Sequence, residues 1–138
     1  MLTYGDGVSD INLHELINFH KSHGKIATLT SINNPSRFGN VQIEENGNVR
    51  EFHEKPDGND TWINGGFFVL EPDIFRYLQG DVDNVQWEKG PLIQIAKDGL
   101  LAAYKHHGFW MAMDAMRDRL ELEAHWKSGN AKWKLWEN

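Results

Sequence analysis

The sequence contains no cysteine. This absence excludes disulfides, zinc sites built on thiolates, and thiol nucleophiles. No apolar run is long enough to span a membrane, and the first residues do not have the basic-then-apolar pattern of a secretory leader. We therefore expect a cytoplasmic globular protein with no membrane partner.

Positive charge is scarce and scattered. The chain has 14 lysines and arginines against 20 aspartates and glutamates, which gives a formal net charge of -6. Nucleic-acid binding requires a concentrated basic surface, so we expect no nucleic-acid partner. An acidic chain that handles phosphates needs a bound cation, which directs attention to carboxylates that could hold one.

The length of 138 residues is that of one modest domain. Neither a repeat nor a linker divides it, so we expect residues 1–138 to form a single domain. Met1 stands directly before the apolar, β-prone run Leu2–Tyr4, with no polar lead-in. A strand of this kind usually lies inside a sheet with neighbours on both sides. We therefore expect that this is a partial domain whose N-terminal half is missing.

The beginning of the sequence alternates strand and helix signals. After Leu2–Tyr4, Asp10 can cap a helix that ends at His23-Gly24, and the run Lys25–Ile32 is rich in β-branched residues. A strand, a helix and a strand in this order favour a right-handed parallel crossover. We predict an α/β fold built on a doubly wound, mixed but mainly parallel, Rossmann-like sheet.

A β-hairpin interrupts this pattern. Val41–Ile43 and Val49–Phe52 alternate apolar and polar residues around Asn46-Gly47, the strongest short hairpin signal. We therefore predict a hairpin inserted into the sheet. For the rest of the chain we predict a strand over 62–70, a short helix from Pro72, a helix through Ile95, a strand over 100–104 and a helix over 115–126.

Two aspartates stand at the ends of apolar segments. Asp6 lies between Gly5 and Gly7, and Asp114 precedes the last predicted helix. If a sheet brings these positions together, the two carboxylates form a site for Mg²⁺, which prefers one or two carboxylates plus phosphate oxygens. The alternatives are structural, because Gly-Asp-Gly is a common turn and Asp114 can cap the helix that begins at Ala115.

Two further segments have both a functional and a structural interpretation. Pro56 restricts Lys55 to extended geometry, so Lys55 can neutralise a phosphate while Glu54 accepts hydrogen bonds from sugar hydroxyls. A solvated strand end is the alternative. In Asn64–Gly66 the paired glycines indicate either a close approach of a ligand or backbone, or a β-bulge.

The seven histidines do not form a ligand set. His106 and His107 are adjacent, so on a strand they point to opposite faces. His20 and His23 are three apart on a helix without a third ligand, and we interpret them as surface groups. No P-loop or complete G-x-G-x-x-G is present, and no Ser/His/Asp order stands out.

Taken in order, several segments resemble the sugar-phosphate nucleotidyltransferases, and within that family the glucose-1-phosphate cytidylyltransferases. The resemblance covers essentially the whole chain. It rests on segments 2–8, 37–39, 54–56, 63–70, 87–88 with 91–92, 108–110 with 113–114, and the tail 133–136, which read L-T-Y-G-D-G-V, R-F-G, E-K-P, I-N-G-G-F-F-V-L, W-E with P-L, G-F-W with M-D, and W-K-L-W.

The resemblance implies a nucleotidyltransferase fold, a Mg²⁺ cofactor and a set of site residues. The implied reaction joins CTP and glucose-1-phosphate to give CDP-glucose and pyrophosphate, without a covalent enzyme intermediate. The implied residues are Asp6 and Lys55 for catalysis, Asp6 and Asp114 for Mg²⁺, and Tyr4, Gly5, Glu54, Lys55, Asn64 and Gly65 for substrate binding.

The sequence also departs from the family pattern. The Gly-Gly-x-Gly-Thr-Arg loop and the lysine after it, which bind the nucleotide phosphates in the family, have no match. We therefore expect the chain to carry the sugar-phosphate and metal half, to lack the nucleotide-binding half, and to be inactive alone, with CTP bound only if that half is supplied. Gly90, Ala115 and Lys132 are smaller departures.

A second class of function stays open, namely a non-catalytic sugar-phosphate-binding or subunit-assembly module. We also expect a homo-oligomer. Without the missing half the first strand is left exposed, and Trp133 and Trp136 stand in the tail, where they can pack on the body or on a partner subunit.

Overall fold

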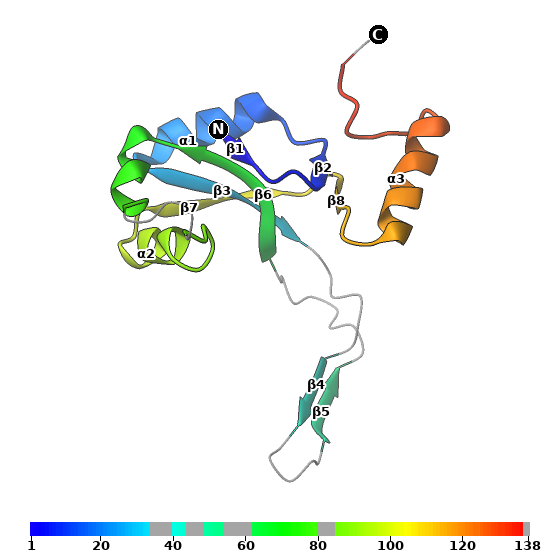
Figure 1. Ribbon diagram of the computed structural model, residues 1–138, viewed down its shortest axis with the longest axis horizontal. Coiled ribbons are helices and arrows are strands. Elements are labelled where there is room, and N and C mark those ends of the chain that lie inside the picture. The colour runs from blue at the N-terminus through cyan, green and yellow to red at the C-terminus, as the bar shows by residue number, and fades with distance from the viewer. Residues whose placement is uncertain (34–39, 44–48, 54–61, 80–84, 137–138) are drawn as a thin grey trace.

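The computed structural model describes residues 1–33, 40–43, 49–53, 62–79 and 85–136 (Figure 1). Its centre is a four-stranded sheet in the order β1-β6-β3-β7. These strands are β1 (Leu2–Thr3), β6 (Trp62–Leu70), β3 (Ala27–Asn33) and β7 (Leu101–His106). β6 is antiparallel to both of its neighbours, whereas β3 and β7 are parallel. The predicted α/β class and mixed sheet are confirmed.

One strand of this sheet, β6, runs against the direction of the others. β1 and β3 run in the same direction, as a crossover through a helix requires, but β6 lies between them. β7 also runs in this direction, so three of the four described strands of this sheet are parallel in direction and β6 alone runs against them. The place of β6 depends on pairings between distant parts of the sequence, which local patterns do not encode.

The first helix, α1 (Leu13–His23), begins later than predicted. Its N-cap is Asn12 rather than Asp10, because Asn12 Oδ1 accepts hydrogen bonds from two backbone N–H groups of the first turn at 3.0 and 3.2 Å. Asp10 faces His106 instead, whose Nε2 lies 2.9 Å from Asp10 Oδ1. The predicted end is confirmed, since Gly24 follows with φ of 67°.

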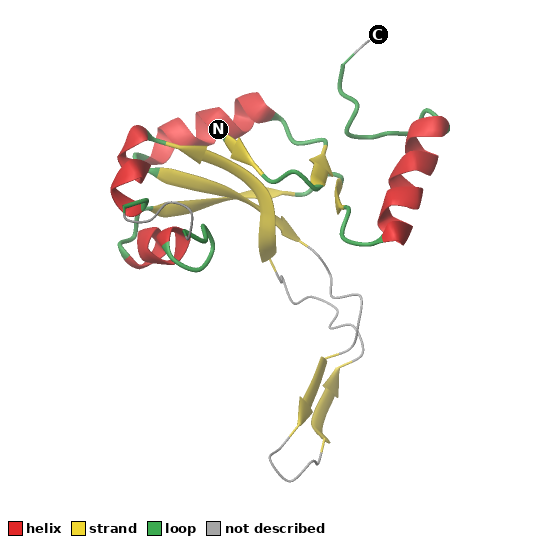
Figure 2. Ribbon diagram, in the orientation of Figure 1, coloured by secondary structure: helices red, strands yellow, loops and turns green. Residues whose placement is uncertain are grey.

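Helices cover both faces of the four-stranded sheet (Figure 2). On one face α1 packs Leu16 against Val69 of β6. On the other face α2 (Pro91–Lys97) packs Ile95 against the beginning of β3, next to the 3-10 helix η1 (Pro72–Tyr77). Successive residues of β6 therefore face different cores, which is the layered arrangement expected of a doubly wound fold.

Two short antiparallel ladders complete the described strands. β2 (Gly7–Ser9) pairs with β8 (Trp110–Ala112), and β4 (Asn40–Ile43) pairs with β5 (Val49–His53). The β4–β5 ladder is the predicted hairpin, and it lies away from the main sheet (Figure 1). Its Asn46-Gly47 turn falls outside the described residues.

The last helix, α3 (Met116–Lys127), stands near β8 and away from the main sheet (Figure 1). The tail after it folds back, because Trp133 stacks on Phe109 with ring centroids 5.6 Å apart. The expected packing of Trp133 on the body is therefore confirmed, whereas Trp136 is 57% exposed. None of the described helices combines the length and the apolar character needed to cross a membrane.

Candidate functional site

The β2–β8 ladder brings two distant aspartates together. In its register Gly7 faces Ala112, and the ladder continues where the backbone N–H of Met113 donates to the carbonyl of Asp6 at 2.8 Å. Asp6 and Asp114 therefore leave the same end of the ladder at neighbouring positions. In this register Asp6 lies opposite Met113, and Asp114 is the next residue along the chain.

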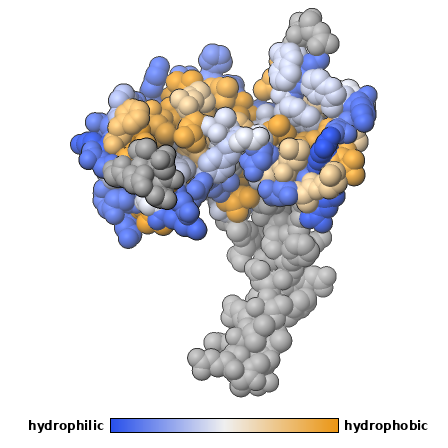
Figure 3. All heavy atoms as spheres, viewed as in Figure 1, coloured by the Kyte–Doolittle hydropathy of each residue, from blue (hydrophilic) through white to orange (hydrophobic). Residues whose placement is uncertain are grey.

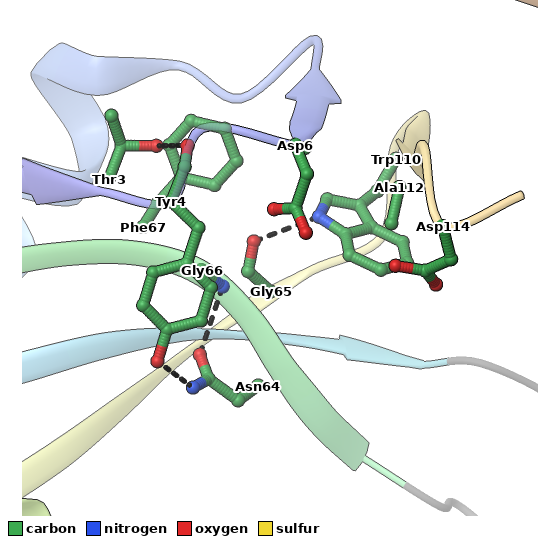
Figure 4. A pocket seen from close by; sticks show the side chains of 11 residues that line it. Thr3, Tyr4, Asp6, Asn64, Gly65, Gly66, Phe67, Trp110, Ala112 and Asp114 are labelled. Atoms are coloured by element: carbon green, nitrogen blue, oxygen red, sulfur yellow. Dashed lines mark hydrogen bonds between the residues drawn. The ribbon is translucent and has the colours of Figure 1, made fainter. Parts of the chain in front are cut away.

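The carboxylates of Asp6 and Asp114 line one cavity of about 180 Å³ between this ladder and β6 (Figure 4). Further polar side chains of the lining come from Tyr4, Asn64 and Trp110. Most of the remaining wall is backbone and small side chains, so a ligand in this cavity would meet main-chain atoms at close range.

The neutral polar groups of the cavity have partners inside the protein. Asn64 Oδ1 accepts a hydrogen bond from the backbone N–H of Gly66 at 2.9 Å, and Asn64 Nδ2 donates to the Tyr4 hydroxyl at 3.1 Å. The indole N–H of Trp110 donates to the carbonyl of Gly65 at 2.8 Å (Figure 4). The amide orientation of Asn64 is fixed, since its oxygen must face the N–H donor.

The glycine pair lies at a β-bulge and in close contact with neighbouring side chains. Gly66 has φ of 77°, and a Cβ added there would lie 2.9 Å from the Tyr4 ring. A Cβ at Gly65 would lie 2.6 Å from the side chain of Ile32. The pairing of β6 with β3 also shifts register at this point, so a bulge and a close approach of other groups occur together.

The two carboxylates differ from these neutral groups because neither has a partner among the described residues. Asp114 is not the N-cap of α3. The cap position is Ala115, whose backbone N–H donates to the Asp118 carboxylate at 2.9 Å. The capping interpretation of Asp114 is therefore wrong, and its carboxylate stands at the cavity together with that of Asp6.

This donor set fits one kind of cation better than others. Within the described ranges, no three side chains of His, Cys, Asp or Glu are grouped to hold a metal ion. A cation at Asp6 and Asp114 would take its other ligands from water and substrate, which suits Mg²⁺ and does not suit a closed zinc site. Both carboxylates are exposed, so a hydrated ion can reach them.

Tyr4 contributes a neutral hydroxyl to the cavity. The pKa of Tyr4 is raised to about 12, mainly by burial and then by the interaction of its hydroxyl with the Glu88 carboxylate. The same interaction lowers the pKa of Glu88. Tyr4 therefore keeps its proton at neutral pH and does not add a negative charge beside Asp6.

Most of the predicted site residues meet in this cavity, namely Tyr4, Asp6, Asn64, Gly65 and Asp114. Gly5 belongs to the adjoining turn and does not line it. Glu54 and Lys55 lie outside the described residues. The roles assigned to all of these residues stay predictions.

Trp110 also lines the cavity, although it is not among the predicted site residues. A chemical signal could have found it. A half-buried indole N–H requires an acceptor, and Trp110 opens the short strand that leads to Asp114.

A second cluster resembles a hydrolase triad in composition only. His106 Nε2 lies 2.9 Å from Asp10 Oδ1 and 3.2 Å from Ser9 Oγ. In a nucleophilic triad the acid and the nucleophile contact opposite ring nitrogens, whereas both face Nε2 here. The Ser9 hydroxyl donates to the Phe109 carbonyl at 2.8 Å. The cluster therefore fastens the β7–β8 connection to β2 and is not arranged for acyl transfer.

His20 and His23 are not the surface groups that the sequence suggested. His20 is only 3% exposed, with Nδ1 2.8 Å from Thr28 Oγ1 and Nε2 3.0 Å from Glu71 Oε1. His23 Nε2 lies 2.7 Å from the same Thr28 oxygen. The physical reason is that these polar partners satisfy the imidazoles inside the fold. None of the four residues lines the cavity.

The sequence matches the family model described as nucleotidyl transferase over residues 1–131. The chain belongs to this family. Among its curated relatives, glucose-1-phosphate cytidylyltransferase of Salmonella typhi is 49% identical over 137 residues, which are 99% of this chain and 52% of the relative. Mannose-1-phosphate guanylyltransferase 1 of Arabidopsis thaliana is 36% identical over 138 residues, 92% of this chain and 37% of the relative.

The resemblance noted in the sequence motifs is therefore confirmed at the level of the family. The chain spans about half the length of the cytidylyltransferase that it matches. A Bacillus anthracis crystal structure named for glucose-1-phosphate thymidylyltransferase has a TM-score of 0.60 at 16% identity, covering 97% of this chain and 55% of that one. At that identity the likeness shows the nucleotidyl transferase fold alone.

Proposed function

We propose that this nucleotidyl transferase chain forms the sugar-phosphate and metal-binding part of a glucose-1-phosphate cytidylyltransferase. The reaction joins CTP and glucose-1-phosphate to CDP-glucose and pyrophosphate. One observation carries the proposal: in a member of this family, the carboxylates of Asp6 and Asp114 line one cavity and have no partner among the described residues. The 49% identity to the Salmonella typhi enzyme supports the choice of substrates.

Asp6 and Asp114 are the residues that would hold Mg²⁺ in this proposal. The ion, when bound, supplies charge neutralisation for the phosphate groups. A chain with a net charge of -6 would otherwise repel a dianionic sugar phosphate at this carboxylate pair. Binding of the sugar phosphate should therefore depend on the cation.

The bond changes need no enzyme nucleophile. A phosphate oxygen of glucose-1-phosphate attacks the α-phosphorus of CTP and forms a new P–O bond. The bond from the α-phosphorus to the oxygen that bridges it to the β-phosphate breaks, and pyrophosphate leaves. The chain then contributes binding and orientation, which the resemblance assigns to Glu54, Lys55, Asn64 and Gly65.

We further propose that turnover requires a nucleotide-binding part that these 138 residues do not supply. Removing the donors that hold a transferring phosphate lowers the rate by orders of magnitude. The chain alone should bind sugar phosphate without releasing pyrophosphate. The alternative, a non-catalytic binding module, predicts the same binding but no pyrophosphate release when the N-terminal half of a relative is added with CTP.

The first experiment is a calorimetric titration of glucose-1-phosphate into the folded chain, with and without Mg²⁺. We expect saturable binding that requires the ion and that is lost in Asp6→Ala and Lys55→Ala. Asp73→Ala and Lys97→Ala are matched controls, because both residues are exposed and lie outside the cavity. Absence of binding to a chain that unfolds cooperatively would overturn the proposed function.

The expected homo-oligomer stays a prediction. Exposed apolar side chains on α3, including Met116, Leu120 and Trp126, support it. Hydrophobic residues also lie at the surface over the main sheet (Figure 3). Sedimentation over a concentration series is the test. A monomer at every concentration would contradict self-association without bearing on the sugar-phosphate site.

A further inference from the structure

The indole of Trp110 joins two separate sheets of the protein. Trp110 belongs to β8 in the two-stranded ladder, and its N–H donates to the carbonyl of Gly65 in β6 at 2.8 Å (Figure 4). Because an indole has a single N–H donor and no acceptor, this bond uses the whole hydrogen-bonding capacity of the side chain. The contact therefore fixes the ring relative to β6.

The segment that the indole holds needs support from outside. At this bulge the partners of β3 change from Phe68 to Asn64 within two residues of β3, so β6 carries extra residues here. Gly65 and Gly66 have no side chains with which to fix their own conformation, and glycine backbones are intrinsically permissive. Asn64 and Tyr4 hold the Gly66 side, through hydrogen bonds at 2.9 and 3.1 Å and from the Tyr4 N–H to the Gly66 carbonyl at 2.9 Å.

Trp110 is the corresponding support on the Gly65 side. It stands on the same strand pair that sets Asp6 beside Asp114, with Ser9 as its partner in the register. Its ring lines the same cavity as the two carboxylates (Figure 4). A displacement of Trp110 would therefore change the bulge and its distance from the carboxylates together.

We propose that Trp110 is a positioning residue, whose N–H bond to the Gly65 carbonyl holds the β6 bulge in place against the Asp6 and Asp114 pair. The role in ligand binding rests on the proposed function. The ordering of the bulge does not, since it follows from contacts inside the protein. Two kinds of measurement can therefore separate the two.

The first measurement needs no ligand. Hydrogen exchange of the Gly66 amide reports local opening of the bulge, because this N–H donates to Asn64 Oδ1. Trp110→Phe keeps an aromatic ring but removes the donor, and we expect exchange to become about tenfold faster. Trp126→Phe, at an exposed position on α3, should leave it unchanged. Equal exchange in the parent and in Trp110→Phe would overturn the proposal.

The second measurement uses Tb³⁺ alone as a probe of the carboxylate pair. Tryptophan excitation sensitises the luminescence of a nearby lanthanide, and Trp110 lines the same small cavity as Asp6 and Asp114 (Figure 4). In Trp110→Phe the sensitised signal should fall to a minor fraction, while directly excited Tb³⁺ still reports binding. Trp126→Phe should keep the sensitised signal. An undiminished signal in Trp110→Phe would overturn the placement of the indole beside the ion.

The third measurement asks whether the bulge matters for the proposed ligand. With Mg²⁺ present, Trp110→Phe should bind glucose-1-phosphate about tenfold more weakly than the parent chain. Benzothienylalanine at position 110 keeps both rings and replaces the N–H by sulfur, so it removes the donor even if the phenylalanine variant folds poorly. Equal weakening in both variants supports the N–H role, whereas normal binding by the benzothienylalanine chain overturns it.

Failure of the proposed function would look different from failure of this inference. If the parent chain does not bind glucose-1-phosphate but Gly66 exchange accelerates in Trp110→Phe, the positioning role stands and the ligand is wrong. If the parent chain binds and both exchange and affinity are unchanged in Trp110→Phe, the ligand stands and the positioning role is wrong.

Discussion

The two ends of the β3–β6 pair treat polar side chains in opposite ways. At one end, where Thr28 lies opposite Val69, the buried groups of His20 and Thr28 have partners within the fold. At the other end, where Ser31 lies opposite Asn64, the adjoining cavity has the carboxylates of Asp6 and Asp114 without partners. Polar groups that hydrogen-bond to one another stabilise a fold, whereas polar groups without a partner in the protein are available to a ligand.

At the Thr28 end, where the polar groups have partners, the hydrogen bonds determine where each proton lies. The backbone N–H of Lys25 donates to His23 Nδ1 at 3.0 Å, so that nitrogen must accept and the proton of neutral His23 is on Nε2. His23 Nε2–H then donates to Thr28 Oγ1, the Thr28 hydroxyl donates to His20 Nδ1, and His20 Nε2–H donates to Glu71. Each donor in this series, which we call the histidine chain, has one acceptor.

The largest effect is expected on Mg²⁺ binding when either carboxylate of the cavity is replaced by a neutral amide. Asp6→Asn and Asp114→Asn should each weaken Mg²⁺ binding by more than about a hundredfold, because each removes one of the two charges. The free energy of unfolding should change by less than about 0.5 kcal/mol, since both side chains are exposed. Calorimetry with Mg²⁺ and urea denaturation measure the two quantities.

Asp73→Asn is the control for that pair, because Asp73 is an exposed carboxylate with its own partner, Arg76, at 3.4 Å. It should leave Mg²⁺ binding unchanged. If the Asp6 and Asp114 variants bind the ion as the parent chain does, the carboxylate pair is not the metal site.

Gly66→Ala sharpens the comparison at the backbone of the cavity. Gly66 and Gly24 both have positive φ, 77° and 67°, but a Cβ at Gly66 meets the Tyr4 ring at 2.9 Å while a Cβ at Gly24 meets nothing within 4 Å. We expect Gly66→Ala to lower the free energy of unfolding by about 2 to 3 kcal/mol and Gly24→Ala by about 1 kcal/mol. Denaturation curves of both variants provide the test, and equal losses would mean that the Tyr4 contact yields without cost.

Thr28→Val removes a hydroxyl from the end of the β3–β6 pair at which polar groups have partners. Thr28 is fully buried, and its hydroxyl bridges two imidazoles, so valine leaves both without that partner. The expected loss is about 2 kcal/mol in the free energy of unfolding. Thr30→Val is a matched control in the same strand, because Thr30 is also fully buried and its Oγ1 has no hydrogen-bond partner within the described part of the chain. That variant should be neutral or stabilising in the same denaturation experiment, and a loss equal to that of Thr28→Val would contradict the bridging role.

Alkaline pH provides a smaller test at the cavity. An unfolded tyrosine ionises near pH 10, whereas burial and then Glu88 raise the pKa of Tyr4 to about 12. Between these values the unfolded chain releases a proton that the folded chain keeps, so the free energy of unfolding falls as pH rises. Tyr4→Phe should lose stability less steeply from pH 10 to 12 than the parent chain, and identical slopes would show that the phenol is not protected.

Much of the local structure follows from the sequence. The Trp62–Leu70 strand has the predicted bounds, α1 ends at the predicted glycine, and the hairpin strands pair as expected. Each depends on a pattern within a few residues, such as alternation or a glycine in the left-handed conformation. The position of β6 between β1 and β3 depends on pairings between distant segments, and no local pattern encodes them.

The candidate site shows the same division. The sequence identifies Asp6 and Asp114 by their positions after apolar segments, and the structure gives the register that joins them. The choice of Asn12 over Asp10 as helix cap could not be predicted, since both residues are good caps. It depends on His106, which lies far away in the sequence and faces Asp10 in the fold.

The smallest expected effect is in acid, and it tests whether the histidine chain can accept a proton. Burial is the largest cause that lowers the pKa of His23 from its ordinary value, and the nearby positive charge of Lys25 adds to it. As pH falls below about 6.5 the unfolded chain takes up a proton at His23 before the folded chain does. The free energy of unfolding therefore falls with decreasing pH. In the folded state a proton on His23 Nδ1 would face the Lys25 N–H, so one donor would lose its acceptor.

His23→Gln should flatten this pH dependence of the free energy of unfolding in urea denaturation series between pH 7.5 and pH 5. His14→Gln, at an exposed position of the same helix, should not. A parent slope retained in His23→Gln would place the acid sensitivity elsewhere.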